Sequence, residues 1–111
     1  MTSLYAQYLK ERRGGETIEE PYGFVTYHLI SETELYIEDV YIIPEERRSH
    51  KAVELWNKVL EIARQKGITR VLGSVDLNTP SRDISIKGLY ARGMKISHYT
   101  NNMLYFEIGV N

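Results

Sequence analysis

The stretch from Ile42 to Gly67, IIPEERRSHKAVELWNKVLEIARQKG, decides the fold of this chain. Pro44 stops an apolar, strand-like segment, a short charged loop follows, and apolar residues then recur at the spacing of a helix. One face of the predicted helix carries Ala52, Leu55, Trp56, Val59, Leu60 and Ala63. Because the opposite face is polar, the stretch predicts a strand end, a loop and an amphipathic helix that ends before Gly67.

The loop from Arg47 to Ala52 is the first candidate binding site. It leads from a strand directly into a helix, whose first N–H groups have no partner inside the helix and lie at the positive end of its dipole. Anions bind at such junctions, and phosphate is the obvious candidate. The sequence therefore predicts a phosphate site at the start of the central helix.

The composition excludes several classes of function. A length of 111 residues suits one domain, and 14 basic residues against 15 acidic ones leave no basic field for nucleic acid or an anionic membrane. The absence of cysteine excludes a disulfide framework, a thiolate nucleophile and a thiolate zinc site, and His28, His50 and His98 lack metal-ligand spacing. Without a signal-peptide core or a membrane-spanning run, we expect a cytoplasmic protein that binds no metal.

The other segments predict an α+β fold with a mixed, mostly antiparallel sheet and helices on both faces. The strand, helix and strand around the central stretch imply a right-handed parallel crossover. In order, the expected elements are a helix over 3–13, an edge strand over 16–20, strands over 22–30 and 35–43, the central helix, a strand over 68–77, a helix over 84–92 capped by Asp83 or Ser81, and a hairpin over 94–99 and 102–108.

Three segments, in the right order, resemble the GCN5-related N-acetyltransferase (GNAT) superfamily. The loop RRSHKA (47–52) matches the spacing of the acyl-CoA signature, in which Arg or Gln is followed after two residues by Gly and then by Gly or Ala; His50 stands where glycine is usual. The strand that ends in Asn78 lies where such enzymes often have an asparagine near the cofactor. LYARGM (89–94) is similar to the Tyr-x-x-Gly-Phe ending of the last helix.

The front of the chain departs from this family. It is short and lacks the usual first strand and a full pair of early helices. Its Tyr-rich start, the GSV strand and the Asn-Asn-Met hairpin resemble small acetyltransferase-like proteins encoded by bacteriophages. The resemblance implies one GNAT-like domain over 1–111, with a shortened N-terminal part and a sheet that splays at a cofactor cleft.

The resemblance also implies an activity and a set of site residues. A primary amine of a small molecule or protein would attack acetyl-CoA directly, with no metal, while a backbone N–H near 40–42, where the strand bulges, polarises the thioester. Tyr90 matches the usual proton donor to the departing thiolate. The residues that would contact the cofactor are Val40, Tyr41, Ile42, Arg47, Arg48, Ser49, His50, Lys51, Ala52, Val53 and Asn78.

The group that removes the proton from the amine has three candidates. Glu38 and Asp39 interrupt an apolar strand, and adjacent strand residues face opposite ways, so only one can point into a cleft. Glu38 is favoured because it shares parity with Val40 and Ile42. Asp39 is the second candidate, and bulk water acting through a relay is the third.

Two other functions compete with catalysis. In one, the chain is a non-catalytic binding module, for example a phage protein that engages a host factor, and His50 has closed the cofactor loop. In the other, it is a scaffold that forms a homodimer through the exposed edge of its last hairpin. The motifs also have structural explanations, since Arg47 could form a solvated ion-paired turn and Tyr90 could simply pack.

Overall fold

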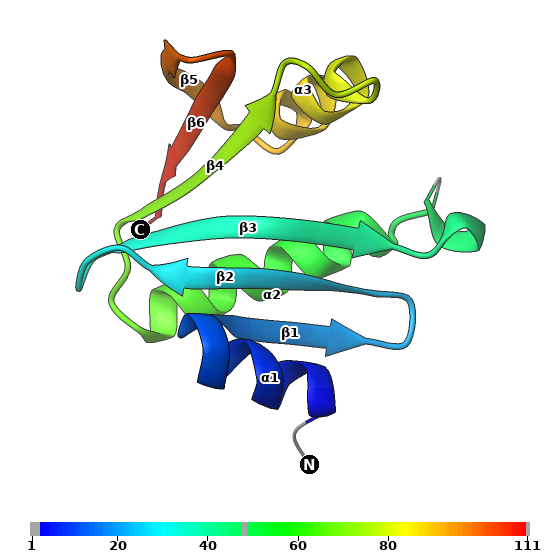
Figure 1. Cartoon of the computed structure of the whole chain (residues 1–111), viewed down its shortest axis with the longest axis vertical. Helices are drawn as coiled ribbons and strands as arrows, with labels where there is room; N and C mark the ends of the chain where they lie inside the picture. The colour runs from blue at the N-terminus through cyan, green and yellow to red at the C-terminus, as the bar shows by residue number, and fades with distance from the viewer. Residues whose placement is uncertain (1–2, 48, 111) are drawn as a thin grey trace.

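The computed structural model in Figure 1 describes residues 3–47 and 49–110. All the helices and strands that the sequence predicts are present, with slightly shifted ends. In chain order they are α1 (Leu4–Arg13), β1 (Glu16–Glu20), β2 (Gly23–Leu29), β3 (Glu34–Ile42), a short 3-10 helix η1 (Pro44–Glu46), α2 (Lys51–Gln65), β4 (Arg70–Asp76), α3 (Arg82–Ala91), β5 (Lys95–Thr100) and β6 (Met103–Gly109). No helix in the described part of the chain is long and apolar enough to span a membrane.

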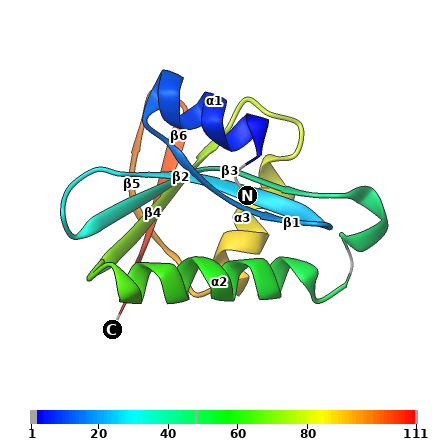
Figure 2. The same ribbon diagram turned by 90° about the horizontal axis from the view of Figure 1, so that it is seen from below.

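The strands form one six-stranded mixed sheet in the order β1-β2-β3-β4-β6-β5. β3 and β4 are parallel and are joined by the crossover through α2, and the other neighbouring strands are antiparallel. Figure 2 shows α1 on one side of the sheet and α2 on the other. α3 shares the side of α2, because its Leu89 and Trp56 of α2 pack against the same core cluster. The predicted α+β class with helices on both faces is confirmed.

The two parallel strands separate soon after they meet. β3 and β4 pair over three residue pairs, from Glu34 opposite Arg70 to Tyr36 opposite Leu72. Beyond these pairs the strands diverge toward their carboxyl ends, as Figure 1 shows. The sheet is therefore open between β3 and β4, as the resemblance implied.

The main core lies between α2 and the sheet. Leu55, Val59 and Ala63 of α2 are buried, as the helical spacing predicted, and they pack in one cluster with Leu35 and Val71. Burying one such aliphatic side chain stabilises the fold by about 1.5–3 kcal/mol. A second cluster around Val75, Met94 and Phe106 lies under α3. Trp56 contacts both clusters and so ties the two halves of the open sheet together.

α1 is capped at both ends but buries little of its apolar surface. The Ser3 hydroxyl accepts from the Ala6 N–H at 3.0 Å, and Gly14 ends the helix with a φ of 68°. Leu9 is the one buried residue of the helix, and Leu4 is 83% exposed. The helix lies beside the edge strand β1, where Lys10 pairs with Glu16.

The start of α3 also differs from the expectation. The helix begins at Arg82, so Asp83 lies inside the first turn and does not cap it. Ser81 occupies the N-cap position without a side-chain hydrogen bond to the helix. The closing hairpin turns at Asn101 and Asn102, whose φ angles of 51° and 62° suit a two-residue turn between antiparallel strands.

Tyr27 makes the stability of this fold sensitive to high pH. Burial raises the pKa of its phenol, and Glu16 across the β1–β2 pair adds to the rise. Stability from such a group is complete below the unfolded-state pKa of about 10 and is lost as the pH rises toward the folded-state pKa. We expect the free energy of unfolding of Y27F to fall less steeply with pH in this range than that of the wild type.

Urea unfolding at a series of alkaline pH values measures this difference. Y99F is the control, because Tyr99 is 58% exposed and should change the pH slope little. An alkaline slope in Y27F equal to that of the wild type would contradict the assignment to Tyr27.

Candidate functional site

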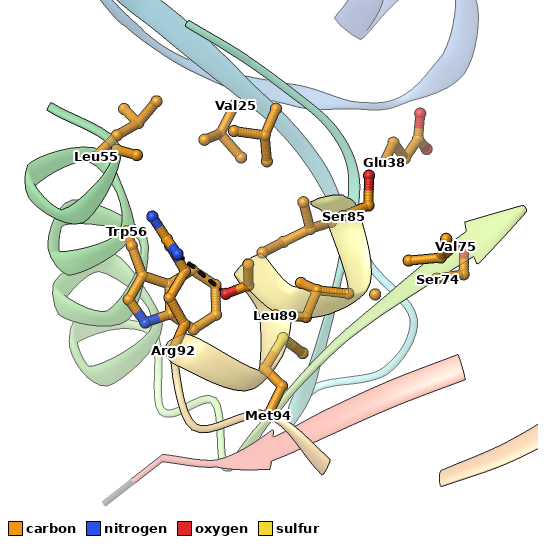
Figure 3. A pocket seen from close by; sticks show the side chains of 15 residues that line it. Val25, Glu38, Leu55, Trp56, Ser74, Val75, Ser85, Leu89, Arg92 and Met94 are labelled. Atoms are coloured by element: carbon orange, nitrogen blue, oxygen red, sulfur yellow. Dashed lines mark hydrogen bonds between the residues drawn. The ribbon is translucent and has the colours of Figure 1, made fainter. Parts of the chain in front are cut away.

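A cleft of about 320 Å³ lies where β3 and β4 separate, between α2 and α3 (Figure 3). Its floor comes from the sheet, with Val40 and Val75 on the two sides of the opening. Trp56 of α2 and Leu89 of α3 line the helical side. A mostly apolar cleft with few polar groups is typical of a small-molecule site.

The cleft has few polar side chains. Glu38 of β3, Ser74 of β4 and Ser85 of α3 line it. Arg92 follows the end of α3, and its Nη1 donates to the Gly88 carbonyl at 3.0 Å (Figure 3). Arg92 is the one cationic side chain among the described residues that line the cleft.

The open edge of β3 supplies backbone donors. The N–H of Ile43 donates to the Tyr22 carbonyl at 2.9 Å, and so points toward β2. Since successive N–H groups alternate between the two edges of a strand, those of Val40 and Ile42 point toward β4, and that of Tyr41 points toward β2. β4 does not pair with this part of β3, so the Val40 N–H faces the cleft that Val40 lines, and the Ile42 N–H lies farther along the same open edge.

β3 contains a bulge at Glu38. Thr26 pairs with Asp39 and Tyr27 pairs with Ile37, which leaves Glu38 as the extra residue. The bulge expected near 40–42 thus lies two to four residues earlier in the chain, at Glu38. The sequence carried a signal for the true position, because the apolar residues change parity from Leu35 and Ile37 to Val40 and Ile42.

Because of the bulge, the expectation that Glu38 faces the same way as Val40 and Ile42 is wrong. The Glu38 carboxylate does not follow the side chains of Val40 and Ile42, and its Oε1 instead lies 2.5 Å from Nδ1 of His28. Asp39 is exposed, opposite Thr26. Glu38 is thus a residue that both lines the cleft and contacts a histidine on the neighbouring strand.

The loop before α2 is held by its own side chains. Arg47 Nε donates to the Ile42 carbonyl at 2.8 Å, and its guanidinium lies 5.5 Å from the centre of the Tyr41 ring. The Ser49 hydroxyl donates to the Glu46 carbonyl at 2.7 Å and accepts from the Lys51 N–H at 3.2 Å. Arg48, which the sequence assigned to the cofactor, lies outside the described residues.

The first turn of α2 approaches the cleft on one side. Ala52 lines the cleft, whereas Val53 is exposed. The Lys51 ammonium lies over the Tyr22 ring, 5.1 Å from its centre. The turn therefore presents its backbone at one end of the cleft with a lysine beside it.

The backbone at His50 is ordinary. Its φ is −79° and its side chain is exposed without a capping hydrogen bond. Glycine is needed where φ is positive, and this position does not demand that freedom. The histidine at the usual glycine position thus fits the loop without backbone strain.

Asn78 and Tyr90 lie away from the lining of the cleft. Asn78 is exposed in the turn after β4, where its N–H donates to Asp76 Oδ1 at 2.9 Å. The Tyr90 ring is 51% exposed and packs edge-on against Phe106, with centres 5.7 Å apart. The described residues that line the cleft include neither of them.

Sequence reasoning missed several residues of the site. Ser74 of β4 lines the cleft and its Oγ lies 2.5 Å from the Tyr36 hydroxyl of β3, just beyond the last strand pair. Two small residues, Gly73 and Ser74, interrupt an otherwise apolar strand, and that signal indicates close approach of another group. His28 and Arg92 carried no local signal, because their roles depend on strand register and helix packing.

The sequence matches the family model described as "Acetyltransferase (GNAT) family" over residues 5–93. Among curated proteins, thialysine N-epsilon-acetyltransferase from Caenorhabditis elegans is 42% identical over 57 residues, which cover 48% of this chain and 36% of that protein. The chain therefore spans about a third of the length of this relative.

Solved structures share the fold at low identity. GCN5 from Tetrahymena has a TM-score of 0.77 and 14% identity, over 100% of this chain and 78% of that one. The PaiA N-acetyltransferase from Thermoplasma acidophilum, in complex with coenzyme A, has a TM-score of 0.70 and 18% identity, over 79% of this chain and 53% of that one. With a family match over residues 5–93 on a mixed sheet that opens between β3 and β4, this chain belongs to the acetyltransferase (GNAT) family.

Proposed function

We propose that this chain is an acetyl-CoA-dependent N-acetyltransferase that acts on a primary amine of a small molecule or protein. The observation that carries the proposal is the cleft between β3 and β4, with apolar walls and the N–H groups of Val40 and Ile42 along one edge. A long acyl-thioester arm with amide groups is a ligand that such walls and donors suit. The PaiA structure, which has a coenzyme A bound, supports this choice of ligand.

The start of α2 would bind the anionic part of the cofactor. Its first-turn N–H groups and dipole would hold the pyrophosphate, and Lys51 adds a cation beside them. This part of the proposal covers the loop and first-turn residues Arg47, Arg48, Ser49, His50, Lys51, Ala52 and Val53. Arg47 contributes mainly through loop shape, because its Nε is engaged by the Ile42 carbonyl.

The reaction needs no covalent intermediate. The amine nitrogen attacks the thioester carbon, the carbon–sulfur bond breaks, and its electron pair leaves with the thiolate. An N–H donor on the carbonyl oxygen, such as that of Val40, is typically worth about 3 kcal/mol of barrier. A base beside the bulge of β3, where Glu38 lines the cleft, would remove the proton from the amine, and such assistance contributes roughly 10²–10⁴-fold.

Tyr90 stays the proposed proton donor to the thiolate, and Asn78 a proposed contact of the cofactor. Tyr90 belongs to α3, which forms one side of the cleft, and its side chain is half exposed. Asn78 follows β4 at the open end of the cleft. Both assignments rest on the family motif.

Calorimetric titration with acetyl-CoA tests the binding site. We expect micromolar binding by the wild type, similar binding of desulfo-CoA, and none of adenosine. S85W should weaken the binding of acetyl-CoA by roughly tenfold or more, because Ser85 lines the cleft and a larger side chain would fill part of it. Tenfold corresponds to about 1.4 kcal/mol of binding free energy. K87W is the matched control on the same helix, since Lys87 is exposed and does not line it. A wild type that binds no acetyl-CoA at millimolar concentration contradicts the proposal.

Detection of released thiol tests the transfer itself. Thialysine is the first amine to try, because the relative that is 42% identical over part of this chain is named for it, and lysine, n-butylamine and a lysine-containing peptide follow. We expect acetyl-CoA and at least one of these amines to yield thiol and the acetylated amine in equal amounts. Tight acetyl-CoA binding without thiol release from any of them would instead favour a non-catalytic binding module.

Replacement of His50 tests whether the missing loop glycine matters. Because φ at His50 is −79°, H50G relieves no strain, and we expect acetyl-CoA affinity within about twofold of the wild type. The melting temperature should fall slightly, since glycine has more conformational freedom in the unfolded chain. An affinity gain of tenfold or more in calorimetry would show that the histidine obstructs the site.

A further inference from the structure

A histidine and a carboxylate meet at the bulge of β3. Nδ1 of His28 on β2 lies 2.5 Å from Oε1 of Glu38, and the two side chains are 38% and 28% exposed. In the strand register His28 faces Tyr36, and Glu38, two residues after Tyr36, lies on the same face and diagonal to His28. The pair therefore lies directly beside the bulge, where the ladder between β2 and β3 is interrupted.

The pair joins the cleft to the opposite face of the sheet. Val25 and Tyr27 of β2 point into the core under α2, so His28, one residue on, points to the face that carries α1. Glu38 lines the cleft itself. A reactive group held by this pair would thus lie between the cleft and the solvent on the α1 side.

A second polar contact, between Tyr36 and Ser74, lies next to the pair of His28 and Glu38. The Tyr36 ring lies 5.4 Å from the His28 ring, and the Tyr36 hydroxyl lies 2.5 Å from Ser74 Oγ, which lines the other side of the cleft. Glu38 and Tyr36, both on β3, thus contact the imidazole. On the same face, Lys10 of α1 is paired with Glu16 of β1.

The contact with Glu38 decides what the imidazole can do. A carboxylate accepts from Nδ1–H, and this leaves Nε2 with a lone pair that accepts a proton. A carboxylate behind a histidine fixes its tautomer and orientation, as in other enzyme sites where the histidine is the base. Histidine is the side chain that most often acts as a general acid or base, so the imidazole suits this task.

We propose that His28 is the catalytic residue that takes the proton from the acceptor amine, and that Glu38 is its positioning residue. The inference rests on the proposed acetyltransfer and also places the amine: it reaches the cleft from the face of the sheet that carries α1. Nε2 of His28 takes a proton from the ammonium group, and the freed lone pair forms the new carbon–nitrogen bond. The carbon–sulfur bond breaks, the amide nitrogen loses its second proton, and the thiolate takes one up.

Two amines separate this role from a structural one. n-Butylamine is mostly protonated near neutral pH and needs a proton acceptor, whereas hydroxylamine is mostly unprotonated. H28Q keeps a donor for Glu38 but has no basic nitrogen. We expect H28Q to lower kcat/KM for n-butylamine by roughly 10²–10⁴-fold and for hydroxylamine far less, with acetyl-CoA affinity unchanged. In H28Q the remaining kcat/KM for n-butylamine should rise with pH in step with the unprotonated amine, whereas E38Q should keep the shape of the wild-type pH–rate profile at a lower rate.

Three results would overturn the assignment while the wild type remains active. H28Q with wild-type kcat/KM for n-butylamine and an inactive E38Q would make Glu38 the base. An equal loss for both amines in H28Q would indicate a structural role. A nitrogen NMR spectrum that shows Nε2 of His28 protonated in the neutral imidazole would exclude it as the acceptor. By contrast, a wild type that releases no thiol from either amine contradicts the proposed function itself.

Discussion

The short parallel ladder between β3 and β4 is the constraint on which the rest of the structure depends. The strands pair from Glu34 to Tyr36 on one side and then separate. Each strand is secured elsewhere, β3 by β2 and β4 by β6, so the separation does not unravel the sheet. Trp56 packs against both core clusters and bridges the two halves. The opening leaves this edge of β3 without a strand partner: Arg47 Nε satisfies the Ile42 carbonyl, and water or a ligand must satisfy the remaining backbone groups.

The bulge at Glu38 changes which face of the sheet the side chains of β3 occupy beside the opening. In a regular strand Glu38 and Val40 would lie on the same face of the sheet. The extra residue shifts the alternation, so that Val40 lines the cleft while the Glu38 carboxylate reaches His28 toward the other side. One backbone irregularity thus connects a cleft formed under two helices to a polar pair at the α1 face.

What the sequence could predict was mostly local. Helical spacing located α2 and its buried face, and Gly14 and Gly67 marked helix ends where φ is positive. The bulge was readable in principle from the parity change between Ile37 and Val40, but strict alternation was assumed across it. The contact between His28 and Glu38 could not be read, because it depends on the register of two strands. The outward packing of Tyr90 depends likewise on how α3 meets β6.

The two sides of the proposed site differ in how strongly they depend on sequence. On the cofactor side the main donors are backbone N–H groups of β3 and of the first turn of α2, and any residue with ordinary φ can supply them. His50 in place of a glycine is compatible with that arrangement, and so is a shared fold at 14% identity with GCN5. On the acceptor side the chemistry lies in side chains, His28 and Glu38, placed by a register and a bulge. The specificity of this chain should therefore reside on the α1 face of the sheet, where its own residues rather than its backbone meet the amine.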